Sequence, residues 1–128
     1  MNQDALKQRT KRFALGIIQL VEAVPKSRSA DVLGRQLLRS GTSVGANYRS
    51  ACRARSAADF ISKMGIVEEE EEEVVVVVVV VESIYWLELL KECKLADSEK
   101  IKALSIEAGE LLAITITSIK TARRNKKQ

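Results

Sequence analysis

Residues 101–122 read IKALSIEAGELLAITITSIKTA and carry the clearest structural signal in the chain. Apolar or small residues recur there every three or four positions, at Ile101, Leu104, Ala108, Leu111, Thr115, Ile119 and Ala122. This spacing puts them on one face of an α-helix, because a helix completes a turn about every 3.6 residues. Asp97 or Ser98, just before the pattern, can cap the helix with a side-chain oxygen. We therefore predict an amphipathic helix over residues 98–122.

Three more segments repeat this pattern, and the sequence predicts helices over about residues 4–23, 29–54 and 57–93. Pro25 ends the first, since a proline disfavours helical geometry at the preceding residue. Ser27 or Ser29 can cap the second. Ser56 and Asp59 have the spacing of a capping box at the start of the third. The apolar positions of these segments are Leu6, Phe13, Ile17, Leu20 and Val24, then Leu33, Leu37, Val44 and Tyr48, then Phe60, Met64, Val67, Ile84, Leu87 and Leu90.

The composition suits one domain over residues 1–128 with an aliphatic core, because hydrophobic residues make up 46% of the chain and aromatic residues only 4%. Four amphipathic segments with short connections predict an all-α fold, an antiparallel up-down four-helix bundle. Small residues from Ser40 to Gly45 interrupt the second helix. They predict a kink or a close approach of a neighbouring helix, rather than a break, because the apolar period continues across them.

A low-complexity run interrupts the third segment. Six glutamates, residues 68–73, precede eight valines, residues 74–81. Valine is a mediocre helix former, so the valines alone read as a strand or an aggregation-prone segment. The glutamates are either an acidic metal or partner site or, as we favour, part of an insertion or a corrupted stretch inside an otherwise regular helix.

Several motifs resemble, in order, those of the four-helix-bundle family of 23S rRNA intervening-sequence proteins, which includes accessory variability proteins of diversity-generating retroelements. The motifs are QLLRS at 36–40, TSVGANYR at 42–49, ARS at 54–56, DFI at 59–61 with Lys63, and YWLELL at 85–90. The resemblance covers nearly the whole chain. It implies a bacterial bundle that assembles as a homopentamer with basic surfaces, and in the retroelement members a partnership with nucleic acid and a reverse transcriptase.

The chain departs from that family at two points. Ser50 stands where the family often has a glutamate. The family pattern also places Phe60 and the Tyr85-Trp86 pair about nine residues closer together, which is half a turn beyond whole helical turns. A continuous third helix would therefore turn Leu87 and Leu90 away from the face that carries Phe60. The run must bulge or break, or the bundle must accept a changed face; we favour a mostly helical segment.

The residues give little support for catalysis. The chain has no histidine, the commonest general base and metal ligand. Cys52 lies among arginines that can lower a thiol pKa, but a structural cysteine is the stronger interpretation. Ser40, Thr42 and Ser43 lack the Gly-Lys-Ser/Thr ending of a phosphate loop. We expect no enzyme activity, no cofactor and no metal.

Basic residues are the best functional lead in a chain of net charge +4. They form two clusters, and the candidate nucleic-acid-binding residues are Arg35, Arg39, Arg49, Arg53 and Arg55, followed by Lys120, Arg123 and Arg124. Guanidinium groups pair well with phosphate. The alternative is a solvated face with ion pairs. The aromatic residues have core-like or interface-like spacing, so we expect backbone-directed binding with weak sequence preference.

Three functions remain open at this stage. The first is an oligomeric accessory protein that binds structured RNA or a nucleoprotein. The second is a structural or protein-interaction bundle without a nucleic-acid role. The third, less favoured, is a helix-turn-helix DNA binder, which requires the helix to break at Gly41. The polar N-terminus lacks a signal sequence and the apolar run is too short to span a bilayer, so we expect a cytoplasmic protein.

Overall fold

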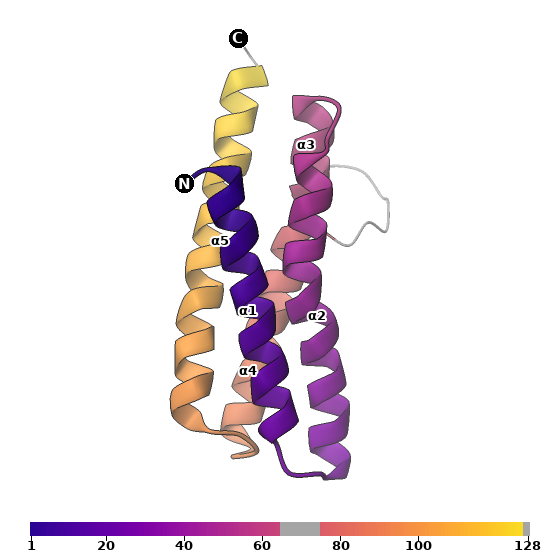
Figure 1. Ribbon diagram of the computed structural model, residues 1–128, viewed down its shortest axis with the longest axis vertical. Helices are drawn as coiled ribbons and strands as arrows, with labels where there is room; N and C mark the ends of the chain where they lie inside the picture. Colours follow the sequence, from indigo (N-terminus) through magenta and orange to yellow (C-terminus); the bar gives the residue numbers. More distant parts are fainter. Residues whose placement is uncertain (65–74, 127–128) are drawn as a thin grey trace.

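The computed structural model describes residues 1–64 and 75–126, and every regular element within these residues is an α-helix. The helices are α1 (Gln3–Ala23), α2 (Arg28–Cys52), α3 (Ala57–Met64), α4 (Val76–Glu92) and α5 (Ser98–Lys126). Helices α1, α2, α4 and α5 run along the long axis of the bundle, while the short α3 packs against α2 and α5 at one end (Figure 1). The predicted all-α class is confirmed as a helical bundle.

The helix ends follow the predicted caps. Ser27 caps α2, because its Oγ accepts a hydrogen bond of 3.0 Å from the backbone N–H of Ala30. Asp97 caps α5 by accepting from the N–H groups of Glu99 and Lys100. Ser56 accepts from the N–H of Asp59 at 3.1 Å at the start of α3. Helix α1 ends at Ala23, two residues before Pro25.

The mostly helical segment predicted over 57–93 contains α3 and α4, and residues 65–74, which include Val67 and Glu68–Glu73, lie outside the described part of the chain, as does the predicted choice between a bulge, a break and a continuous helix. Reading the valines locally as a strand is wrong for Val76 to Val81, which are helical. Val76, Val79 and Val80 are buried with the spacing of a helix face. Met64 and Leu87 both lie in the core, so the two helices present a common inner face despite the extra residues.

The core is aliphatic, as predicted. Its fully buried side chains come from all five helices, and among the largest are Phe13, Ile17, Leu20, Leu37, Met64, Leu87, Leu90, Ile101, Leu111 and Ile119. Burial of this apolar surface is the main favourable contribution to folding. No helix in the described residues is long and apolar enough to cross a membrane.

Helices α1 and α2 approach closely where small residues replace bulky ones. A β-carbon added at Gly41 would lie 2.9 Å from Cγ1 of Ile17, and one at Gly45 would lie 3.1 Å from Oγ1 of Thr10. Helix α2 nevertheless runs unbroken through Gly41. The prediction of close packing without a break is therefore confirmed.

Polar contacts also fix how the helices meet. The hydroxyl oxygens of Ser40 on α2 and Ser83 on α4 lie 2.9 Å apart in the core, and Ser83 also lies 2.7 Å from the carbonyl oxygen of Val79. Ser83 has a single hydroxyl proton, so if it donates that proton to Val79, Ser40 donates to Ser83. The pair sets the register between α2 and α4.

Candidate nucleic-acid interface

The arginines of α2 lie on its outer face. Leu37, Val44 and Tyr48 turn inward, so residues half a turn away turn outward. Arg35, Arg39, Arg49 and Arg53 occupy that outer side, and all four are exposed. The helical pattern thus turns arginines that are scattered along the sequence into a stripe along one helix.

The first half of this stripe is paired with carboxylates. Arg35 lies 3.3 Å from Asp31 one turn earlier, and both side chains are about 70% exposed. Arg39 contacts Glu82 across the α2–α4 interface and donates a hydrogen bond of 3.2 Å to Gln36. Here the alternative interpretation, a solvated face with ion pairs, applies.

The second half of the stripe differs. Within the described residues, no carboxylate lies within ion-pair distance of Arg49, Arg53 or Arg55. Asp59 is close in sequence, but its carboxylate accepts from the backbone N–H of Arg55 and pairs with Lys63 at 3.4 Å. Among the described residues, therefore, no carboxylate competes with an outside anion for the guanidinium groups at the end of α2.

The fold adds a second set of cations to the same end. The end of α2, the start of α3, the C-terminal turns of α5 and the N-terminus all lie at one end of the bundle (Figure 1). We call this the basic end, defined by Arg49, Arg53, Arg55, Lys120, Arg123 and Arg124. Lys120 and Arg124 are exposed and Arg123 is half-buried. Six of the eight predicted residues thus belong to segments at this end of the bundle, whereas Arg35 and Arg39 lie farther along α2.

Other candidate chemistry finds no support in the described residues. No three His, Cys, Asp or Glu residues there form a group that could hold a metal ion. Cys52 is half-buried with a free thiol. It lies beside Tyr48, whose pKa is raised by burial and by this thiol. The hydroxyls of Thr42 and Ser43 bond to backbone carbonyls of their own helix.

One polar cluster was not anticipated from the sequence. Arg9 of α1 forms ion pairs with Glu107, at 2.6 Å, and with Glu110, and its side chain is only 19% exposed. These contacts raise the pKa of the Arg9 guanidinium further above its ordinary value, so it stays charged. Two glutamates three residues apart on one helix face were the available signal, but their partner lies about a hundred residues away. The cluster joins α1 to α5, and because Arg9 is already paired with carboxylates we do not count it among the candidate phosphate-binding residues.

The crystal structure of a protein of unknown function from the S23 ribosomal protein family of Bacteroides thetaiotaomicron is similar to this chain at 32% sequence identity. The superposition has a TM-score of 0.79 and covers 94% of this chain and 99% of that one. No curated protein matches the chain. The profile of the 23S rRNA-intervening sequence proteins matches residues 3–117. The chain therefore belongs to the family of 23S rRNA-intervening sequence proteins.

Proposed function

We propose that this protein is a non-catalytic accessory factor that binds the phosphate backbone of structured RNA, alone or within a nucleoprotein, through its basic end. One observation carries the proposal. The ends of α2 and α5 lie at the same end of the bundle (Figure 1), and Arg49, Arg53 and Arg55 have no carboxylate partner among the described residues. Guanidinium groups bind phosphate with paired hydrogen bonds.

The distribution of acidic residues supports the same proposal. The single run 68–73 holds six of the 17 acidic residues, and the rest of the sequence has eleven acidic and 21 basic residues. Binding to RNA would release the counterions held by the phosphates, so the affinity should fall steeply as salt rises. Contacts to phosphate carry little sequence information, so the preference among sequences should be weak.

The two halves of the arginine stripe supply a matched test. The change Arg49→Gln with Arg53→Gln removes two cations that have no carboxylate partner in the described part of the chain, and Arg35→Gln with Arg39→Gln removes two that already have such partners. Binding of a labelled RNA hairpin would be measured by fluorescence anisotropy across a series of salt concentrations. We expect the first pair to lower the log–log salt slope by about one unit per lost phosphate contact. We expect a clearly smaller change for the second pair.

Equal effects of the two double variants would contradict the assignment to the basic end. Binding that does not change with salt, or no binding even at low salt, would contradict phosphate recognition altogether. The latter result would favour the second candidate function, a structural or protein-interaction bundle.

Self-association is part of the proposal, since the family resemblance implies a homopentamer and several copies would add their weak phosphate contacts. A stripe on α4 supports it. Val78, Val81 and Tyr85 follow one another at helical spacing and are 43%, 50% and 52% exposed. Clusters of exposed apolar side chains commonly mark protein contacts.

The mass in solution tests this part. We expect an oligomer for the wild-type chain and a smaller species for Val81→Glu, because a charge would have to be buried in the contact. Ile106→Glu is the control, since Ile106 is similarly exposed at 56% but lies on α5. A monomeric wild-type chain would remove the multivalent arrangement, and equal effects of the two variants would place the contact elsewhere.

A further inference from the structure

A cleft of about 560 Å³ opens at the basic end, where α1, α3 and α5 meet. It arises because α5 continues past the start of α1. Gln3, the first residue of α1, lines the cleft, and Figure 1 shows α5 running on past the start of α1 to its own end at Lys126. The side of α5 that α1 covers farther down is therefore left open.

The lining of this cleft mixes apolar side chains with uncharged polar ones. Thr117, Thr121 and Asn125 form the wall on α5, and Leu6, Tyr48 and Phe60 face it from the other helices. No Asp, Glu, Lys or Arg among the described residues lines it. The cleft thus combines an apolar surface, in which Phe60 is half-buried and Tyr48 buried, with uncharged hydrogen-bonding groups.

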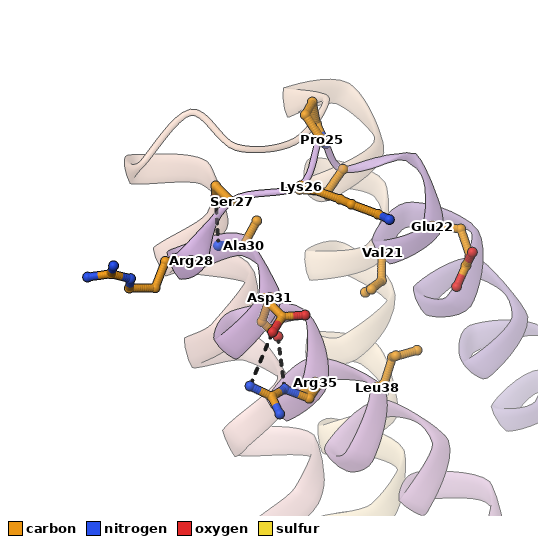
Figure 2. Close-up of a pocket in the computed structure, with 12 residues that line it drawn as sticks. Val21, Glu22, Pro25, Lys26, Ser27, Arg28, Ala30, Asp31, Arg35 and Leu38 are labelled. Atoms are coloured by element: carbon orange, nitrogen blue, oxygen red, sulfur yellow. Dashed lines mark hydrogen bonds and ion pairs between the residues drawn. The ribbon is translucent and has the colours of Figure 1, made fainter.

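A second cleft lies at the α1–α2 turn, and the charge of its lining residues differs from that of the first. It is of similar size, about 660 Å³, and charged residues of both signs line it (Figure 2). Arg35 pairs with Asp31 there, and Lys26 and Glu22 face water. Such mutually compensating charges do not single out a ligand. No such pairs of oppositely charged side chains line the cleft at the basic end among the described residues.

Cationic residues near the uncharged cleft restrict the class of ligand that the cleft would bind. Lys120 and Arg124 lie on the same turns of α5 as Thr121, and Arg49 and Arg53, which pair with no carboxylate of the described residues, lie at the same end of the bundle. A ligand that fits both features has a flat uncharged ring with polar edges, joined to a phosphate. Proteins recognise unpaired nucleotides in this way, through aromatic contact, base-edge hydrogen bonds and guanidinium–phosphate pairs.

We propose that the cleft bounded by Leu6, Tyr48, Phe60, Thr117, Thr121 and Asn125 takes an unpaired base of the bound RNA. This inference rests on the proposed function and deepens it: the basic end holds the phosphates, and the cleft selects RNA that offers a single-stranded nucleotide. The basic end alone accounts for binding to duplex. The cleft adds a preference for loops, bulges or tails.

The experiment compares a blunt RNA hairpin with the same hairpin carrying a short single-stranded tail. Each is titrated with the wild-type chain, Thr121→Trp and Ala103→Trp at one low salt concentration. The indole of Thr121→Trp would fill the cleft, whereas Ala103 is exposed elsewhere on α5 and serves as the control. We expect the tail to raise the affinity of the wild-type chain and of Ala103→Trp by about tenfold, the usual scale for one base–aromatic contact. We expect Thr121→Trp to lose this gain and keep its affinity for the blunt hairpin.

A second readout does not depend on any variant. A fluorescent adenine analogue in the tail should change its emission when the wild-type chain binds, because the base leaves water. Equal affinity for the two hairpins, or a gain that survives in Thr121→Trp, would overturn the cleft assignment and leave the phosphate proposal intact. Failure of both hairpins to bind would instead remove the proposed function and this inference with it.

Discussion

Replacing Gly41 with alanine tests the closest approach in the bundle. The added β-carbon would lie 2.9 and 3.0 Å from Cγ1 and Cγ2 of Ile17 and 3.3 Å from its Cβ. Ile17 is fully buried, and its branched side chain has few alternative rotamers. The clash therefore cannot be relieved by moving the end of a flexible side chain, and α1 and α2 must separate slightly.

Two opposing terms set the change in unfolding free energy that Gly41→Ala causes. Overpacking a core typically costs about 1–3 kcal/mol, and three close contacts with a rigid neighbour place this site in the upper half of that range. Alanine also favours the helix over glycine by about 1 kcal/mol. The expected net loss of unfolding free energy is therefore about 1–2 kcal/mol.

Gly109 provides the control. It lies in α5, is exposed, and an added β-carbon there would have no neighbour within 4 Å. Only the helix-propensity term applies, so Gly109→Ala should stabilise the protein by about 0.5–1 kcal/mol. Urea unfolding followed by far-UV circular dichroism, at one protein concentration, measures both variants. If Gly41→Ala is as stable as the wild type, or more stable, the helices do not meet at this distance and the reasoning fails.

Two further predictions concern buried polar groups. Ser83→Ala leaves the Ser40 hydroxyl with only the Leu37 carbonyl at 3.4 Å, so we expect the free energy of unfolding, measured in urea, to fall by about 1–3 kcal/mol. Ser40→Ala should cost less in the Ser83→Ala background than it does alone. Strictly additive losses would mean that the two hydroxyls do not interact. Burial raises the pKa of Tyr48, so above about pH 10 the unfolded chain releases a proton that the folded chain keeps, and stability should fall as pH rises. Tyr48→Phe should flatten this decline in a comparison of urea midpoints at neutral and alkaline pH, and an unchanged pH dependence would show that Tyr48 is not responsible.

Local signals in the sequence were sufficient to predict most helices. The caps at Ser27 and Asp97 and the stop before Pro25 lie where predicted, because each depends on atoms a few residues apart. The inward faces of α1, α2 and α5 were also predictable, since an apolar repeat of three and four residues fits only one side of a helix. The family likewise followed from ordered motifs and is confirmed.

The valine run is a segment whose structure such local signals do not predict. Identical residues have no period, so nothing in the run itself chooses between strand and helix or selects the side to be buried. The neighbouring helices choose Val76, Val79 and Val80 for the core and leave Val78 and Val81 outside. Packing overrides the weak local preference of valine, because the apolar surface buried by Val76, Val79 and Val80 outweighs the low helix propensity of the run.

The sequence by itself determined that the chain would form amphipathic helices with arginines on an outer face, because side-chain direction follows from helical geometry over a few residues. Only the tertiary structure decided which of those arginines meet a carboxylate. Glu82 reaches Arg39 from another helix, while the end of α2 lies at the same end of the bundle as the end of α5, which is far along the chain (Figure 1). The tertiary structure also forms the uncharged cleft, because α5 extends past the start of α1 only when the two helices are packed together. Such contacts depend on how distant segments align in space, and a local pattern does not encode that alignment.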